Sequence, residues 1–336
     1  MNRTYLYAAS AYLGLAIAGC ASSRSQASQN SANGQAVSQG RQFSEWSQPV
    51  NVGPEINTEF NEQFPTISAD GLSLYFSSDR PGGFGGADIY VSHRTTVSSP
   101  WGKPQNLGPK INSSGDDHSQ NFSTDGHWMW FASDRPGGCV DQAEGNRNAK
   151  LDIWVSYRKD IRDDNAWEAP VNLGCSFNSS AGDSCPFYFE DQASGAKVLY
   201  LVSGRPGGPG KWNVYVGTQQ KDKHFGPPVL VKEVSSSEFD FHFAPRLDGL
   251  EAFMWTRRAG GLGKGDLWVS TRASTREVWS TPVNLGPTLN TEFDEQMPSL
   301  SADDTELFFP SNRPGGNGGY DLYVSRRQPL TQHAGR

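Results

Sequence analysis

Residues 77–92 read SSDRPGGFGGADIYVS, and residues 310–325 read PSNRPGGNGGYDLYVS. Related stretches occupy residues 202–217 (VSGRPGGPGKWNVYVG) and 255–270 (WTRRAGGLGKGDLWVS), and a split copy lies at 132–138 (ASDRPGG) and 151–156 (LDIWVS). In these copies a glycine-rich turn separates two runs of β-forming residues, which is the pattern of a hairpin. The chain therefore contains five copies of one unit.

A second motif opens each unit. It reads WSQPVNVG at 46–53, WGKPQNLG at 101–108, WEAPVNLG at 167–174 and WSTPVNLG at 279–286, with a weaker version, FGPPVLV, at 225–231. Repeats spaced 54 to 66 residues apart indicate a propeller or a solenoid.

The strand pattern favours the propeller. The first unit has three short β-rich runs, at 65–68, 74–77 and 89–92, in addition to its opening motif. Asp-Gly pairs at 70–71 and 125–126 predict a hairpin turn between the first two strands. No opening motif follows the fifth unit, so residues 46–52 are expected to supply the outer strand of the last blade and close the ring. The sequence predicts an all-β, five-bladed propeller of four-stranded antiparallel blades.

These residues resemble the TolB-type, WD40-like β-propeller repeat, P-x-x-S-x-D-G-x-x-L-Y-F-x-S-x-R-x-G-G…D-I-Y-V. Units one and five are close to it, unit two carries an insertion, and units three and four are degraded. The resemblance covers roughly residues 46–327 and implies a fold, not an activity. The chain departs from the TolB-type proteins because five units replace six and no α/β domain precedes them.

The amino end is read as an export signal. Residues 5–18 form an uncharged, mostly apolar run, and Ile17-Ala18-Gly19-Cys20 resembles the lipobox of bacterial lipoproteins. This resemblance implies cleavage before Cys20 and acylation of that residue. Ala21 stands where Asp would signal inner-membrane retention, so we expect an outer-membrane anchor facing the periplasm or the cell surface. The predicted segments are a signal peptide (1–19), an acylated cysteine and tether (20–45), the propeller (46–327) and a tail (328–336).

Charge and composition exclude several partners and cofactors. The 336-residue chain carries a net charge of −7 without a basic run in its interior, which argues against nucleic-acid binding. It lacks Cys-x-x-Cys and His-x-x-x-His metal motifs, phosphate-binding loops and dinucleotide fingerprints. The sequence indicates no cofactor and leaves open a calcium ion in the channel. We expect a monomer.

The candidate ligand-binding residues stand where each inner strand begins, around one end of the central channel. They comprise a carboxylate from every blade, two glutamines and two histidines: Glu62, Gln63, Asp117, His118, Asp183, Asp240, His242, Glu295 and Gln296. One interpretation is that these residues only cap strand ends and bind water. The other two are a site for a polar ligand or cation, and a catalytic site with a carboxylate pair.

The favoured function is a non-catalytic envelope lipoprotein that binds a protein or glycan through this channel mouth. The alternative is a carbohydrate-active enzyme, a glycoside hydrolase or polysaccharide lyase. Five-bladed furanosidase-like glycosidases place carboxylates at similar positions. Because every blade here has an acid, no pair stands out, and no catalytic residue is assigned.

The other repeated residues are expected to be structural. We predict ion pairs within or between blades for Arg80, Arg135, Arg205, Arg258 and Arg313 and for Asp88, Asp152, Asp266 and Asp321, and packing between blades for the opening tryptophans. Beyond Cys20 the cysteines are Cys139, Cys175 and Cys185. The preferred disulfide is Cys175–Cys185, because these residues flank one loop, with Cys139 as a competitor from the neighbouring blade.

Overall fold

The computed structural model describes residues 43–139 and 151–330. The predicted signal peptide, Cys20, residues 20–42 of the tether and residues 331–336 of the tail lie outside these residues. Within them the chain forms twenty β-strands and no helix, so an all-β fold is confirmed. A search of these residues finds no helix long and apolar enough to cross a membrane.

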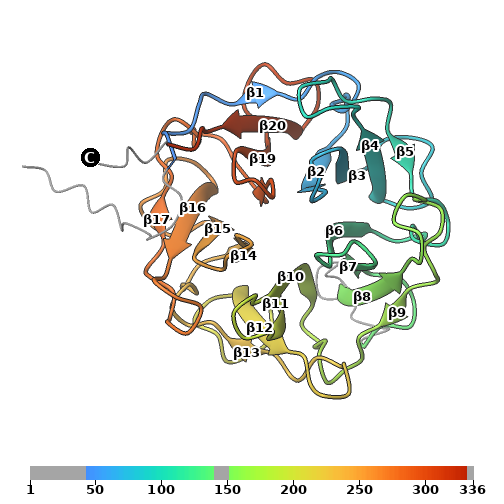
Figure 1. Ribbon diagram of the computed structural model, residues 1–336, viewed down its shortest axis with the longest axis vertical. Coiled ribbons are helices and arrows are strands. Elements are labelled where there is room, and N and C mark those ends of the chain that lie inside the picture. Colours follow the sequence, from blue (N-terminus) through green and yellow to red (C-terminus); the bar gives the residue numbers. More distant parts are fainter. Residues whose placement is uncertain (1–42, 140–150, 331–336) are drawn as a thin grey trace, which may run out of the picture. The chain divides into compact units, whose positions relative to one another are not determined.

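The strands form five sheets of four, and within each sheet neighbouring strands are antiparallel, as predicted (Figure 1). From the channel outward, blade 1 contains β2 (Glu62–Ile67), β3 (Ser73–Ser78), β4 (Asp88–His93) and β5 (Gln105–Asn106). Blade 2 contains β6 (Asp117–Phe122), β7 (Trp128–Ser133), β8 (Asp152–Tyr157) and β9 (Val171–Asn172). Blade 3 contains β10 (Asp183–Glu190), β11 (Lys197–Ser203), β12 (Asn213–Thr218) and β13 (Val229–Leu230).

Blade 4 contains β14 (Asp240–Pro245), β15 (Glu251–Thr256), β16 (Asp266–Thr271) and β17 (Val283–Asn284). Blade 5 contains β18 (Ser299–Leu300), β19 (Glu306–Ser311), β20 (Asp321–Arg326) and, as its outer strand, β1 (Val50–Asn51).

The ring closes where the sequence predicts it. Strand β1 pairs with β20, Val50 opposite Val324, and Ser47 N–H donates to the Arg326 carbonyl. Phe43 and Pro329 form a further bridge beside this pair. In Figure 1 the first described residues, in blue, lie against the last, in red. The two ends of the described chain therefore share one blade.

The strand order gives the propeller two distinct faces. One face carries the loops that lead into the inner strands and the glycine-rich turns between the second and third strands of each blade; we call it the mouth face. The opposite face, the turn face, carries the turns between the first and second strands. The predicted Asp-Gly turns lie there, and Gly71 and Gly126 adopt positive φ angles of 72° and 73°. Blade 5 has Asp304 (φ 67°) at this position instead of glycine.

The hydrophobic core lies between the blades, as one buried cluster at each of the five junctions. Trp101, Trp167 and Trp279 are buried in these clusters, which confirms the predicted packing role of the opening tryptophans. An arginine lies over each of these rings, with guanidinium-to-centroid distances of 4.4 Å for Arg94, 4.4 Å for Arg158 and 4.1 Å for Arg272.

The inner strands carry bulges that turn side chains toward the channel. The register of β2, β6 and β10 shifts within each strand, and Phe64, Ser119 and Cys185 adopt positive φ angles there. Met297 does the same in blade 5. A left-handed backbone is strained for these residue types, but its recurrence in four blades shows that it belongs to the fold. In blade 4 the shift falls earlier, between Asp240 and His242.

Candidate functional site

The five predicted mouth carboxylates are fully buried and paired with an arginine of their own blade. Glu62 lies 3.0 Å from Arg80, Asp183 2.6 Å from Arg205, Asp240 2.7 Å from Arg258 and Glu295 3.1 Å from Arg313, and Asp117 pairs with Arg135. The predicted ion pairs of these arginines are therefore confirmed as bridges within single blades.

Further donors complete each of these carboxylates. Glu62 accepts hydrogen bonds from the Thr58 backbone N–H (2.8 Å), the Thr58 hydroxyl (2.7 Å) and Ser78 (3.0 Å) as well as from Arg80. Because Glu62 is fully buried behind these donors, neither of its oxygens is exposed to a ligand. The structure thus supports the interpretation that Glu62, Asp117, Asp183, Asp240 and Glu295 cap strand ends, and it gives them no access to a ligand.

The second acidic series also has a structural role. Asp88 accepts from Phe84 N–H (2.6 Å) and from the side-chain amide of Asn106 (2.9 Å), and so ties the glycine-rich turn to the outer strand. Asp266 makes the same contacts with the Leu262 backbone and Asn284. Asp152 and Asp321 likewise accept from the backbone of their turns. Among the described residues no ion pair joins Asp88, Asp266 or Asp321, so the ion pairs predicted for these three residues are wrong, and amides bind them instead.

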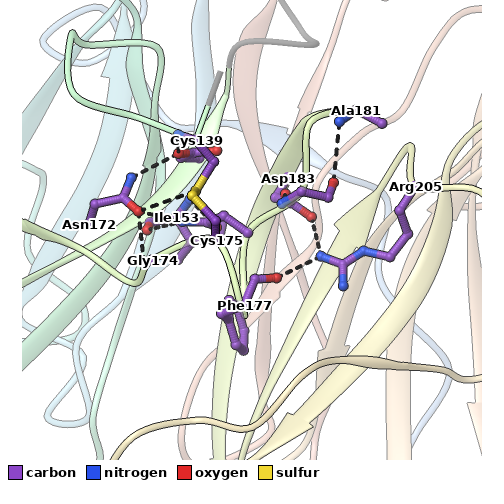
Figure 2. Close-up of a disulfide and its surroundings, with 12 residues drawn as sticks. Cys139, Ile153, Asn172, Gly174, Cys175, Phe177, Ala181, Asp183 and Arg205 are labelled. Atoms are coloured by element: carbon purple, nitrogen blue, oxygen red, sulfur yellow. Dashed lines mark hydrogen bonds and ion pairs between the residues drawn. A yellow bond between two sulfur atoms is a disulfide. The ribbon is translucent and has the colours of Figure 1, made fainter. Parts of the chain in front are cut away.

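The predicted Cys175–Cys185 disulfide is wrong: the bond joins Cys139 to Cys175 (Figure 2), with Cα atoms 5.4 Å apart. Cys139 lies in the glycine-rich turn of blade 2, and Cys175 lies in the loop leading into blade 3, so both are on the mouth face. Cys185 is on the inner strand β10, where the bulge buries its thiol near Ser119 and Ser184. Closeness in sequence did not bring the two residues together, because the strand carries Cys185 into the channel.

His118 and His242 face the central channel. The His118 ring stacks on Phe64 with centroids 4.5 Å apart, and its Nδ1 lies 2.7 Å from the Ser119 hydroxyl. Burial lowers the pKa of His118, although Asp116, Asp117 and Asp134 act in the opposite direction. His242 lines a channel cavity of about 20 Å³ together with residues of all four other blades, including Phe64, Ser119, Phe187 and Pro298. That volume admits one water molecule, not a sugar.

The remaining candidates, Gln63 and Gln296, belong to a hydrogen-bonded network at the mouth. The Gln63 amide donates to the Gln296 carbonyl oxygen (3.0 Å), and the Gln296 amide donates to Asp294 (2.9 Å) and to the Tyr320 hydroxyl (3.0 Å). Tyr320 in turn donates to Asp294 (3.0 Å). Burial and the Asp294 carboxylate raise the pKa of Tyr320, which keeps its hydroxyl protonated.

Asp294, absent from the predicted residues, is the centre of this network. Its other oxygen accepts from the Trp255 indole N–H (3.1 Å), and Arg257 lies 3.6 Å away. Trp255 fits there because blade 4 has Gly265 beside it: a Cβ at that position would lie 2.2 Å from the indole nitrogen. The tryptophan at position 255 and the glycine at position 265 therefore depend on each other in blade 4.

Aromatic side chains gather on the same side of the mouth. Phe241 lies between Trp212 and Trp255, with centroids 5.0 and 5.3 Å away. Phe239 lies under the guanidinium of Arg257 at 5.7 Å. Trp212 and Trp255 are buried, whereas Phe239, Phe241 and Tyr320 are partly exposed. We call Trp212, Phe239, Phe241, Trp255, Arg257, Asp294 and Tyr320 the aromatic arc; it belongs to blades 3 to 5.

The repeat makes the arc stand out, because equivalent positions in other blades hold different residues. The position of Trp255 is occupied elsewhere by Ser77, Ala132, Val202 and Pro310. The position of Tyr320 and Trp212 is occupied elsewhere by Ala87, Leu151 and Gly265. The position of Arg257 is occupied elsewhere by Asp79, Asp134, Gly204 and Asn312. These departures from the repeat are visible in the sequence. They are missed when only the acids that all five units share are considered as site residues.

A further cavity lies on the turn face. It is a groove of about 720 Å³ between blades 5 and 1, lined by Val50, Val97, Trp101 and the charged residues Asp70, Arg94, Asp303, Glu306 and Arg326. Arg94 donates to Glu306 (2.7 Å), and Arg326 pairs with the same carboxylate (2.8 Å). Its buried charges are thus satisfied within the protein.

Within residues 43–139 and 151–330, no group of three or more His, Cys, Asp or Glu side chains is placed to hold a metal ion.

Comparisons with known proteins find solved structures of similar fold. No protein-family model and no curated protein sequence matches the chain. The catalytic domain of a GH62 α-L-arabinofuranosidase from Coprinopsis cinerea matches in structure with a TM-score of 0.55 and 12% identity, over 84% of this chain and 97% of that domain. An α-L-arabinofuranosidase from Lactobacillus brevis matches with a TM-score of 0.50 and 13% identity, over 84% and 94%.

TolB from Acinetobacter baumannii matches with a TM-score of 0.46 and 14% identity, over 80% of this chain and 55% of TolB. At such identities the likeness shows the fold alone: the described chain is a five-bladed β-propeller.

Proposed function

We propose that the protein binds a glycan at the aromatic arc of its mouth face and does not hydrolyse it. The observation that carries this proposal is the arc itself. Partly exposed Phe239, Phe241 and Tyr320 offer ring surface, and Gln63, Arg257 and Tyr320 offer polar groups beside it. A few fixed polar groups among aromatic side chains are what a small-molecule or sugar site requires.

Two lines of support point to a glycan as the ligand. The propellers that match with TM-scores of 0.50 and 0.55 are named as arabinofuranosidases, so this fold accommodates sugars in those proteins. The arc also departs from the repeat in several residues at once, whereas the residues that hold the blades together recur. A function at the arc explains why several neighbouring residues depart from the repeat together at this part of the ring.

A glycoside hydrolase is the second candidate, because both of those neighbours are hydrolases. Hydrolysis needs a carboxylic acid and a carboxylate on either side of the scissile bond. Each of the five inner carboxylates is buried and forms an ion pair with an arginine of its blade. Asp294 accepts hydrogen bonds from Trp255, Gln296 and Tyr320. With Arg257 also 3.6 Å away, Asp294 is engaged by groups of the protein itself and is not free to serve as an acid or base toward a ligand. Binding without turnover therefore takes precedence.

The test is a binding and turnover assay on residues 43–336. The protein is titrated with arabinan, arabinoxylan and xylan oligosaccharides by calorimetry, and the mixtures are assayed for new reducing ends. We expect binding without new reducing ends, and a loss of at least about tenfold in affinity for Phe239→Ala. Trp128→Ala is the matched control, because Trp128 is a 43% exposed aromatic residue at the turn-face end of β7.

Each outcome of this assay decides between the candidates. Reducing ends that disappear in Asp294→Asn would replace the proposal by the hydrolase. Equal losses in Phe239→Ala and Trp128→Ala would remove the site from the aromatic arc. No binding to any neutral or charged glycan would overturn the function itself. Thermal unfolding of each variant shows whether a loss reflects binding or folding.

The proposal includes attachment to the cell envelope, on the strength of the Ile17–Cys20 motif. We expect the full chain to incorporate radiolabelled palmitate in a bacterial host and to sediment with membranes. Cys20→Ser should abolish both. Labelling that survives this substitution would contradict the anchor and leave the glycan proposal untouched.

A further inference from the structure

Three cationic side chains lie at the mouth of blades 3 and 4, although the protein as a whole is acidic. They are Lys211, Arg257 and Lys264, and all three are exposed. At the positions of Lys211 and Lys264, blades 1 and 5 have Gly86 and Gly319; blade 2 has Lys150, which lies outside the described residues. Arg257 belongs to the aromatic arc, and Lys211 and Lys264 stand next to its residues Trp212 and Trp255 in a chain of net charge −7.

Arg257 lacks the capping role that its position has in blades 1, 2 and 5. In blade 1 the equivalent Asp79 accepts from the Asn61 backbone N–H (2.8 Å), and in blade 5 Asn312 accepts from the Asp294 backbone (3.0 Å). A guanidinium accepts no hydrogen bond, so Arg257 cannot cap this loop. Blade 4 gives up the cap and gains a cation at the mouth.

The guanidinium of Arg257 is held in place with N–H donors to spare. It lies 5.7 Å from the Phe239 centroid and 5.6 Å from the Trp255 centroid, and its distance of 3.6 Å from Asp294 exceeds a hydrogen bond. The side chain is 44% exposed. By comparison, the intra-blade arginines are 11–15% exposed and donate at 3.1 Å or less. Arg257 is the exposed arginine of the arc with donors facing solvent.

Lys211 extends this cationic surface along the mouth. Its ammonium nitrogen lies 5.8 Å from the ring centroid of the same Phe239. Asp294, in the loop that leads into blade 5, forms an ion pair with Arg257 at 3.6 Å. The other acids of the adjacent loops, Glu238 and Glu292, are exposed, and among the described residues no ion pair joins them to Lys211, Lys264 or Arg257. The two ammonium groups and the solvent-facing donors of Arg257 are therefore available to a ligand that lies on Phe239.

We propose that the glycan bound at the aromatic arc is acidic, and that Arg257 binds a uronate carboxylate while Phe239 packs against a sugar ring. This inference rests on the proposed function and adds the charge of the ligand to it. A planar guanidinium matches a carboxylate through two parallel N–H donors. Lys211 and Lys264 would attract further carboxylates of the same chain, so affinity should fall as salt rises.

The experiment compares three probes on residues 43–336: polygalacturonate, the same polymer fully methyl-esterified, and dextran sulfate. Affinity electrophoresis or calorimetry gives the affinity at 50 and 300 mM salt. We expect polygalacturonate to bind at least about tenfold more tightly than its ester, because the ester removes the charge that Arg257 pairs with. Arg257→Asn, which restores the blade 5 residue, should erase that difference. Arg276→Asn, an exposed arginine outside the mouth, is the control.

The outcomes separate this inference from the proposed function. Equal binding of polygalacturonate and its ester, or of Arg257→Asn and the parent protein, would overturn the acidic ligand and leave glycan binding standing. Tighter binding of dextran sulfate would assign the site to sulfate esters instead of carboxylates. If no glycan binds in either experiment, both proposals fail. Circular dichroism of Arg257→Asn confirms that the blade is folded.

Discussion

His242 is a neutral histidine held inside the channel. Its Nε2 lies 3.0 Å from the Pro298 carbonyl, while Nδ1 is buried with no hydrogen-bond partner. Burial lowers the pKa of His242 from 6.5 to about 4. Between these values the unfolded chain binds a proton that the folded protein does not, so stability falls as the pH drops from about 6.5 to about 4.

Replacing His242 should therefore make the protein more tolerant of acid. Blade 5 has Met297 at the equivalent position, which makes His242→Met a conservative change. Relative to the parent protein, the variant should retain about 2 kcal/mol more of its pH 7 stability at pH 4, an order-of-magnitude figure from the lowered pKa. Urea unfolding at both pH values measures this. His224→Gln, at an 85% exposed histidine, should change nothing, and an equal loss in parent and His242→Met would contradict the argument.

At the residue scale the sequence predicted which side chains approach the channel but not what they do there. Gln63, His118, His242 and Gln296 lie at the channel or its mouth as expected. The carboxylate beside each of them turns back into its blade, because an arginine 18 or 22 residues later donates to it. Both residue series were visible in the repeat, yet their pairing depends on how the second strand folds over the first.

The blade is the element in which these pairs act. In blade 1 Arg80 contacts Glu62 and also donates to Ser78 (3.1 Å) and to the Ile56 carbonyl (2.7 Å). Its guanidinium lies 5.1 Å from the rings of both Phe76 and Tyr90. One side chain thus joins the inner strand, the second strand, the third strand and the preceding loop, which explains why an arginine recurs in every unit.

Removing this arginine should leave a buried charge without its partner. We expect Arg80→Met to lower the free energy of unfolding by about 3 kcal/mol at pH 7, since Glu62 is fully buried. Denaturant unfolding of the parent protein and the variant at pH 7 measures this loss. Arg276→Met, at an exposed arginine, is the control. A similar loss of stability in this variant would show that the Arg80–Glu62 ion pair does not stabilise the blade.

At the element scale, the residue types of the turns predicted the structure most reliably. Asp-Gly at 70–71 and 125–126 and the glycine-rich turns fall where the sequence predicts them, because few residues other than glycine accept these backbone angles. The inner-strand bulges escaped prediction, since Phe64, Ser119, Cys185 and Met297 share no residue type. The bulge also decided the disulfide, because it moves Cys185 away from Cys175 and leaves Cys139 as the nearer thiol.

For the whole molecule, five units of one pattern and an unpaired opening motif were sufficient to predict a closed ring. The candidate binding site could not be predicted from the repeats, because the repeats identify only the residues that the blades share. The aromatic arc consists of what blades 3 to 5 do not share with the others. Departures such as Trp255 with Gly265 can be read from the sequence only after the strands are aligned by their pairing.

Ring closure gives the last prediction. Strand β1 covers the edge of β20, and the preceding segment packs Trp46 against Arg327, whose guanidinium lies 4.4 Å from the indole centroid. A chain beginning at Gly53 loses both contacts and exposes the backbone edge of β20 to other molecules. Compared with a chain beginning at Phe43, it should unfold at a temperature lower by at least about 8 °C, in line with the loss of a packed tryptophan and two strand residues. Light scattering should show association of the shorter chain as the exposed edge finds partners. Equal melting temperatures and a monomeric shorter chain would mean that the interfaces between blades, and not the shared fifth blade, hold the ring closed.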